Sequence, residues 1–338
     1  MFNPNANGVG AMAERLPRTP MALRLSHPHI TLKLMVTNMP TTRRELLQTA
    51  AVSALAATVP WVAAQEIAKP RKDLARQLGV TTGSFVKHLS KTRAEGKLRL
   101  LDLPKIMRDD LDLKVLDLMT ATIPSWEADY LDELKGKAAE AGCVITNLKL
   151  NQKDLDMASP DADTRKRALD EYRRSIDAAQ RLGCRWVRPL PSTKRPDFKL
   201  YAAAYRELIE YAQPRGIELL IENNAWMQDD PDAIPQVIQA VGAGLHAQPD
   251  TGNWTAKSRY DGLAKAFPLA VSCDFKAKEL GPNGEHSAYD LHRCFAIGWQ
   301  SGFRGPWCFE HAHEELSGLW RGLITLRDLL RKWMAESR

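Results

Sequence analysis

Short apolar runs follow amphipathic helical segments along most of the chain. The segment "DADTRKRALDEYRRSIDAAQRL" places apolar or small residues at helical spacing with charges between them, and "KLYAAAYRELIEYAQP" does the same. Gly142, Gly183, Gly216 and Gly244 each close such a segment, and an apolar run begins at once. "SWEADYLDELKGKAAEA" predicts a further helix with Ser125 as its N-cap. The pattern indicates helices that alternate with buried strands.

Eight apolar runs are candidate strands. They lie near residues 78–83, 114–122, 144–150, 185–190, 217–223, 244–249, 270–276 and 306–311. Eight βα units in about 270 residues are typical of a (β/α)₈ TIM barrel rather than a doubly wound sheet. No GxGxxG motif follows a strand and no P-loop is present, which excludes those nucleotide-binding folds. We therefore predict a single-domain α/β barrel.

The first part of the chain has a different composition. Arg43 and Arg44 precede an Ala-rich apolar stretch that ends near 62–64, and this arrangement resembles a twin-arginine export signal. The alternative is an ordinary Ala-rich helix that starts at Thr41. Met39 stands where such a signal normally begins.

We expect residues 1–64 to be an extension with a removable signal and residues 65–338 to form the barrel. The expected location is the periplasm or the cell exterior, reached through the twin-arginine export machinery. No apolar run approaches the roughly 20 residues of a permanent membrane span.

Net charge and cysteine content argue against a nucleic-acid-binding protein and against a CxxC-type metal or redox site. The formal charge is +6, but residues 1–64 hold six Lys/Arg and two Asp/Glu, so the remainder carries +2 (6 − 4). This near-neutral remainder does not favour a nucleic-acid partner. The five cysteines form no CxxC motif, and we expect them to be buried small hydrophobic residues.

Carboxylates mark the ends of four consecutive predicted strands. They are Glu222 in "ELLIENN", Asp250 in "QPDTGN", Asp274 in "SCDFKAK" and Glu310 in "WCFEH". The carboxyl ends of barrel strands meet at one mouth, where four such groups would repel one another unless a cation lay among them. We predict one divalent ion bound by all four, with Mg²⁺, Mn²⁺, Co²⁺ and Zn²⁺ as candidates. For Asp274, a salt bridge with Lys276 or Lys278 is the alternative.

The motifs "IENN", "DTGN", "DFKAKELGPNGE" and "GFRGPWCFEH" resemble the xylose-isomerase-like TIM barrels, which include sugar isomerases, epimerases and related endonuclease-type barrels. The resemblance covers roughly 75–335. In that family strands five to eight give Glu, Asp, His and Glu to one metal, and Glu222, Asp250 and Glu310 match. Asp274 replaces the usual His, which implies an all-carboxylate site that favours harder ions. Asn253 stands where some epimerases have a substrate-facing His.

The chemistry implied by the resemblance is proton transfer next to a sugar carbonyl. The metal would bind the carbonyl and its neighbouring hydroxyl, and Glu222 and Glu310 would remove and return the proton from opposite faces. Lys276 would stabilise the developing negative charge, or would simply pair with Asp274.

Several other polar residues are weaker candidates. Arg188, at the end of strand four, and Lys149, on strand three, could contact an anion or a sugar hydroxyl or form salt bridges. Asn224, Trp226, Asn253 and Trp254 follow strands five and six and are candidate substrate contacts, with loop packing as the alternative for the tryptophans. His246 fits a core histidine better than a ligand. His311 and His313 could bind a metal or lie exposed in a loop.

The predicted function is thus a metal-dependent sugar isomerase or epimerase acting on a small sugar. A lyase or dehydratase on oxidised sugars shares the same enolisation step, and a non-catalytic sugar-binding barrel is a further alternative. An abasic-site endonuclease is disfavoured because strand-end histidines are scarce. The sequence leaves open the sugar, its phosphorylation and whether the chain forms homo-oligomers.

Overall fold

Eight parallel strands form the centre of the molecule. The computed structural model describes residues 73–90, 96–152 and 154–337, so the predicted export signal within residues 1–64 lies outside the described residues. The strands are β1 (Leu78–Thr81), β2 (Val115–Met119), β3 (Val144–Leu150), β4 (Trp186–Pro189), β5 (Glu218–Ile221), β6 (Leu245–Ala247), β7 (Cys273–Lys276) and β8 (Trp307–Glu310). Each predicted strand is confirmed within a few residues.

The strands curl into a barrel. Their hydrogen-bonded order is β6-β5-β4-β3-β2-β1-β8-β7, and every pair is parallel. The β6 and β7 edges meet through two isolated bridges, Ala247 with Ala270 and Asp250 with Asp274. The predicted TIM barrel is therefore present, with its seam between β6 and β7.

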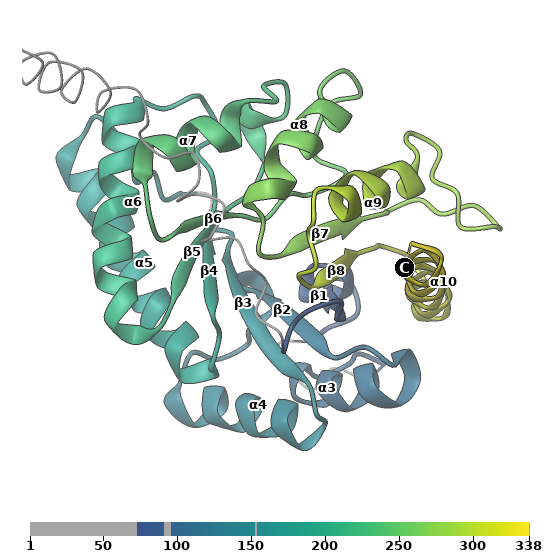
Figure 1. Cartoon of the computed structure of the whole chain (residues 1–338). Helices are drawn as coiled ribbons and strands as arrows, with labels where there is room; N and C mark the ends of the chain where they lie inside the picture. Colours follow the sequence, from purple (N-terminus) through teal and green to yellow (C-terminus); the bar gives the residue numbers. More distant parts are fainter. Residues whose placement is uncertain (1–72, 91–95, 153, 338) are drawn as a thin grey trace, which may run out of the picture. The chain divides into compact units, whose positions relative to one another are not determined.

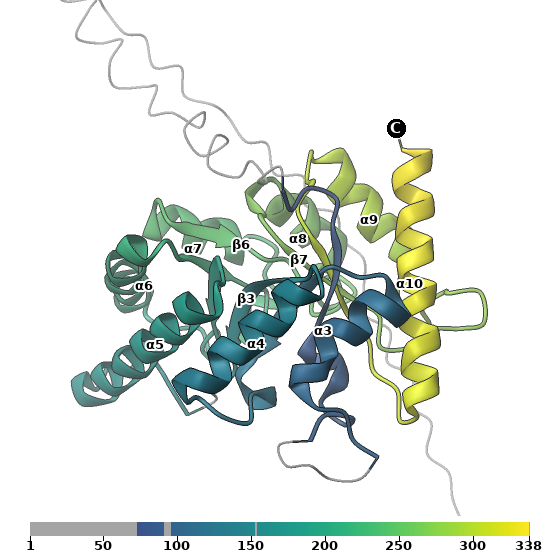
Figure 2. The ribbon, with the colours of Figure 1, turned by 90° about the horizontal axis from the view of Figure 1, so that it is seen from below.

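Helices cover the outside of the strands (Figure 1). They are α3 (Leu103–Ile106), α4 (Ala128–Glu140), α5 (Ala162–Leu182), α6 (Phe198–Ala212), α7 (Ala233–Val241), α8 (Arg259–Ala266), α9 (Leu291–Gln300) and α10 (Leu316–Glu336). Figure 2 shows the long α10 beside α9, where Trp333 and His292 are in ring contact at 5.0 Å. Within the described part of the chain, no helix has the length and apolar character needed to cross a membrane.

Local sequence explains where the helices begin and end. At the start of α5, Asp161 Oδ1 accepts a hydrogen bond from the Thr164 amide at 2.7 Å, and Gly183 ends the helix with φ of +80°. The predicted N-cap of α4 is wrong. Ser125 Oγ instead accepts from the Glu127 amide in a local turn, and the helix begins at Ala128.

Two apolar clusters hold the barrel. The larger lies between strands and helices and includes Leu219 and Ile221 of β5, whereas Leu220 between them belongs to the smaller cluster inside the barrel. This alternation follows from the two-residue period of a strand. The five cysteines are free and buried, as predicted.

Candidate functional site

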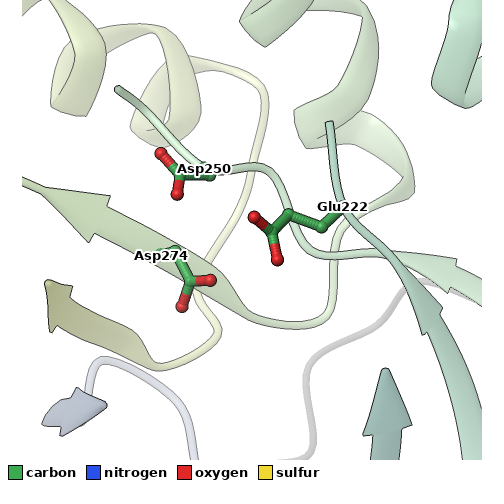
Figure 3. Close-up of side chains that lie close together, drawn as sticks. All are labelled: Glu222, Asp250 and Asp274. Atoms are coloured by element: carbon green, nitrogen blue, oxygen red, sulfur yellow. The ribbon is translucent and has the colours of Figure 1, made fainter. Parts of the chain in front are cut away.

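Three carboxylates converge at the carboxyl ends of β5, β6 and β7 (Figure 3). Glu222, Asp250 and Asp274 each offer an oxygen within 4.8 Å of the others, and all three side chains are buried. Glu222 immediately follows β5 and Asp250 lies three residues beyond β6, while Asp274 projects inward from β7. The convergence predicted from the strand ends is confirmed for these three residues.

Glu310 lies beside this group rather than in it. At the end of β8, its Oε1 is 3.1 Å from Lys276 Nζ and 3.6 Å from Lys278 Nζ. Burial acts to raise the pKa of Glu310, but the neighbouring lysines lower it further, so the net pKa lies below its usual value. Glu310 is therefore ionised at neutral pH.

Lys276 links several of these groups. Its Nζ lies 2.7 Å from Asp250 Oδ2 and donates to Asn253 Oδ1, also at 2.7 Å. Burial acts to lower the pKa of Lys276, but the charges of Asp250, Glu310 and Glu222 raise it above the usual value. The side chain remains an ammonium group and is not a base at neutral pH.

Asp274 pairs with Lys149 of β3. Lys149 Nζ lies 2.5 Å from Asp274 Oδ1, and both side chains are almost completely buried. The alternative predicted from the sequence was a salt bridge between Asp274 and Lys276 or Lys278. Asp274 does form a salt bridge, but with Lys149, and Lys276 pairs with Asp250 and Glu310 instead. Nothing local predicts the pair, because 125 residues separate its members.

Glu222 has a polar partner on each side. Arg188 Nε of β4 lies 3.0 Å from Glu222 Oε2, and Asn253 Nδ2 donates to Glu222 Oε1 at 2.7 Å. Arg188 also donates through Nη2 to Asn151 Oδ1 at 2.7 Å. Asn253, predicted as a substrate contact, thus connects Glu222 with Lys276 through the two ends of one amide.

Asp250 is fixed by its own loop and by Asn223. Asp250 Oδ1 accepts from the amides of Gly252 and Asn253 at 2.7 and 3.0 Å. Asn223 donates to the Asp250 carbonyl at 3.0 Å and accepts from the Asp250 amide at 2.7 Å. Asn223, the first amide of "IENN", was not among the predicted site residues, whereas Asn224 beside it was.

A polar layer supports the carboxylates from inside the barrel. Asp117 of β2 accepts from Thr146 Oγ1 at 2.6 Å and from Gln248 Nε2 at 3.1 Å. Gln248 Nε2 also lies 3.4 Å from Asp274 Oδ1, and its Oε1 accepts from Asn147 Nδ2 at 3.0 Å. None of the residues of this layer was predicted as part of the site. Their signal in the sequence was polar residues within or directly after apolar runs.

The described part of the mouth has more negative than positive charges. Its five carboxylates are Asp117, Glu222, Asp250, Asp274 and Glu310, and its four cations are Lys149, Arg188, Lys276 and the more exposed Lys278. Burial and the neighbouring Glu310 and Glu222 outweigh Lys276 and raise the pKa of Asp250 to about 6. Burial, together with nearby carboxylates, also raises the pKa of Asp274 well above its usual value. The surplus of one negative charge (5 − 4) and the all-oxygen donor set fit a hard divalent ion.

The two predicted tryptophan contacts differ in position. Trp254 is 1% exposed and packs against Gly262 of α8 in the outer core, so the packing alternative holds for it. Trp226 is half-buried after β5, in edge contact with Phe198 and 5.0 Å from the guanidinium of Arg195. Asn224, also half-buried, precedes the short turn Ala225–Met227 that carries Trp226.

The histidines lie outside the three-carboxylate group. His246 is buried deeper in the barrel, 3.7 Å from Glu218 Oε1, as expected of a core histidine. His311 is buried, and its Nδ1 lies 2.6 Å from the Ala277 carbonyl oxygen, while His313 is exposed. Among the described residues, the acidic group that could hold a metal contains neither His311 nor His313.

A hollow of about 840 Å³ lies between the loop after β7 and the first turns of α10. Lys278, 3.6 Å from Glu310 Oε1, forms part of its wall, whereas none of the three converging carboxylates does.

Comparison with known families agrees with this architecture. Residues 110–321, more than half of the chain, match the family described as "Xylose isomerase-like TIM barrel". A comparison with curated proteins gives no significant match.

Solved structures share the fold at low sequence identity. D-psicose 3-epimerase from Clostridium cellulolyticum H10, determined with D-tagatose, is 16% identical, with a TM-score of 0.61 over 76% of this chain and 98% of that one. An L-ribulose 3-epimerase is 16% identical, with a TM-score of 0.61 over 78% and 95%. A barrel protein from Mycobacterium smegmatis in complex with magnesium is 16% identical, with a TM-score of 0.57 over 77% and 97%.

Proposed function

Because this chain belongs to the xylose isomerase-like TIM barrel family, we propose that it is a sugar isomerase or epimerase that transfers a proton next to a carbonyl group. The observation that carries the proposal is the convergence of Glu222, Asp250 and Asp274 beside the ionised Glu310. The epimerase structures named above support it through their common fold.

A divalent ion is part of the proposal. Glu222, Asp250 and Asp274 would hold it, and the oxygen-only set favours Mg²⁺ or Mn²⁺ over Zn²⁺ or Co²⁺. When bound, such an ion would polarise the sugar carbonyl and acidify the neighbouring C–H. The magnesium-bound relative is consistent with this choice.

The protein's own groups fit the two proton transfers. Glu310, an ionised carboxylate, would accept the proton from the carbon next to the carbonyl, and the C–H electron pair would form the enediolate double bond. Lys276, held as an ammonium group, would stabilise the charge that develops on the carbonyl oxygen.

The second transfer completes the reaction. Glu222 would pass a proton taken from solvent to the same carbon from the opposite face, giving epimerisation, or to the neighbouring carbon, giving isomerisation. Glu310 would then release the abstracted proton to solvent. A lyase on oxidised sugars would share the first step and would differ in expelling a leaving group.

Deuterium exchange tests the proposal directly. The protein is treated with EDTA, reloaded with Mg²⁺ or Mn²⁺, and incubated in D₂O with D-fructose, D-psicose, D-tagatose and D-fructuronate, while NMR follows loss of the C–H signal. We expect metal-dependent exchange with at least one sugar and a loss of about 100-fold or more in Glu310→Gln. Glu140→Gln, an exposed carboxylate on α4, is the matched control.

Metal content gives the second measurement. We expect about one tightly held divalent ion per chain, reduced in Glu222→Gln. If the reloaded protein neither holds an ion nor exchanges any of these sugars, the proposal is wrong and a non-catalytic sugar-binding barrel is the better description.

A further inference from the structure

We propose that Arg188 makes this site selective for sugar acids, that is, for keto-sugars that carry a carboxylate. The inference rests on the proposed function, since it names the substrate class of the same site. It is argued from the burial of the Arg188 guanidinium and from the N–H groups of that guanidinium that make no hydrogen bond.

Arg188 is buried with much of its donor capacity unused. Its side chain is 3% exposed, and Nη2 donates to Asn151 Oδ1. Neither Nε nor Nη1 makes a hydrogen bond to any residue that the structure describes. Buried donors in folded proteins are nearly always satisfied by protein, water or a ligand, so donors left open beside a candidate site are available to a ligand.

Glu222 balances the charge of Arg188 without satisfying its donors. The Nε and Oε2 atoms are 3.0 Å apart, yet the N–H is not aligned for a hydrogen bond. Glu222 receives its aligned hydrogen bond from Asn253. Among the residues that the structure describes, Nη1 therefore has no partner at all, while Nε faces Glu222 without an aligned hydrogen bond.

A carboxylate matches these donors better than a hydroxyl does. The guanidinium group is a planar fork, and a carboxylate offers two oxygens in one plane, whereas a sugar hydroxyl offers one oxygen and must also place its own hydrogen. The net charge of the groups at the mouth also favours an anionic substrate. If the partly exposed Lys278 is counted, four cations face five carboxylates, and a divalent ion changes the sum to +1 (4 + 2 − 5). One substrate carboxylate would neutralise it.

The barrel order also places the carboxylate within the substrate. Arg188 lies on β4 and Glu310 on β8, which are four strands apart in either direction around the eight-stranded barrel. They therefore stand on opposite sides of the mouth. A sugar whose reacting carbon faces Glu310 would extend its far end toward Arg188, which favours a terminal carboxylate remote from the carbonyl.

Calorimetric binding with matched sugar pairs tests this inference without requiring turnover. D-fructuronate is compared with D-fructose, and 5-keto-D-gluconate with L-sorbose, each at saturating Mg²⁺ and again at saturating Mn²⁺. Within each pair the two sugars differ in the carboxylate. We expect wild-type protein to bind at least one acid tenfold or more tightly than its neutral partner.

Substitutions of Arg188 separate the effect of its planar hydrogen-bonding geometry from the effect of its positive charge. Arg188→Gln should reduce the preference for the acid, taken as the ratio of acid to neutral-sugar affinity in the same variant, to within about twofold. Arg188→Lys should keep only part of the preference, because it retains the charge but not the planar fork. Lys278→Gln, which removes a more exposed cation at the same mouth, should lose less of the preference than Arg188→Gln. Thermal unfolding of each variant verifies that it is folded.

Equal affinity for acid and neutral sugar in both pairs would overturn the inference, as would an acid preference that persists in folded Arg188→Gln. Selective acid binding by a protein that neither holds an ion nor exchanges deuterium would instead leave the inference intact and refute the proposed function.

Discussion

Lys149 and Asp274 are separated by 125 residues in the chain, yet Lys149 Nζ lies 2.5 Å from Asp274 Oδ1 inside the barrel. Burial acts to lower the pKa of Lys149, but Asp274 and the carboxylates around it raise it above its usual value. The pair therefore holds an ammonium group directly against a residue that we expect to bind metal. Strand β3 is thereby coupled to the chemistry of β7.

Removing Lys149 should destabilise the metal-free protein strongly. In Lys149→Met, Asp274 would be left buried without its cation, which typically costs about 3–5 kcal/mol of unfolding free energy. Urea unfolding in EDTA at pH 7 measures the change. Lys137→Met, which removes the exposed partner of Glu140, is the control and should cost under about 1 kcal/mol. Equal costs for the two variants would contradict the prediction.

Asp250 should make the metal-free protein less stable as pH rises toward neutrality. Its pKa is raised from 3.8 to about 6 in the fold, so the folded state binds the proton more tightly than the unfolded state. The stability that Asp250 contributes is present below pH 4 and is lost as pH rises through about 6, by roughly 3 kcal/mol. Unfolding in EDTA between pH 4 and 7 should show this fall in wild type and a smaller one in Asp250→Asn. An identical pH slope in both proteins would exclude Asp250 as its source.

Asn253 should matter through the two groups that it joins. Asn253→Ala removes hydrogen bonds to Glu222 and Lys276, and hydrogen bonds to charged groups are worth about 1.5–3 kcal/mol each. We expect deuterium exchange to slow by about 10- to 100-fold with a smaller change in KM. Asn283→Ala, in the exposed turn after β7, is the matched amide control and should retain its rate. A loss confined to KM would show that Asn253 only contacts the substrate.

Two glycines of α10 provide a packing test. A Cβ at Gly322 would lie 2.0 Å from Nε2 of His311, which is buried and fixed by the Ala277 carbonyl, so Gly322→Ala should cost about 1–3 kcal/mol. A Cβ at Gly318 would meet His313 at 2.1 Å, but that ring is exposed and can move. Thermal unfolding should therefore show a smaller loss for Gly318→Ala. Adding His311→Ala should reduce the cost of Gly322→Ala.

The barrel could be predicted from the sequence because its strands and helices follow from local patterns of apolar residues and helix-ending glycines. The eight apolar runs became the eight strands, four of them directly after helix-ending glycines, and three of the four carboxylates at their ends converged as expected. The partners of those carboxylates were harder to predict. Which lysine meets Asp274 depends on the relative positions of β3 and β7 around the barrel, and no local pattern contains that information.

Neighbouring residues in a tight loop can also face opposite ways. Asn253 contacts Glu222 in the site, whereas the next residue, Trp254, is buried against α8. The loop turns sharply because Asp250 accepts two of its amides. Sequence position alone placed both side chains at the mouth, and the turn sends only one of them there.

The seam of the barrel coincides with its acidic cluster. Between β6 and β7 a continuous ladder is replaced by isolated bridges, and one of these pairs Asp250 with Asp274. Separation of β6 from β7 would move two of the three converging carboxylates apart. An ion bound by both carboxylates would therefore oppose opening of the barrel at this sparsely hydrogen-bonded seam. Slow hydrogen exchange at the amides of Thr251 and Asp274, which donate across the seam, would then report ion occupancy as directly as an assay of turnover.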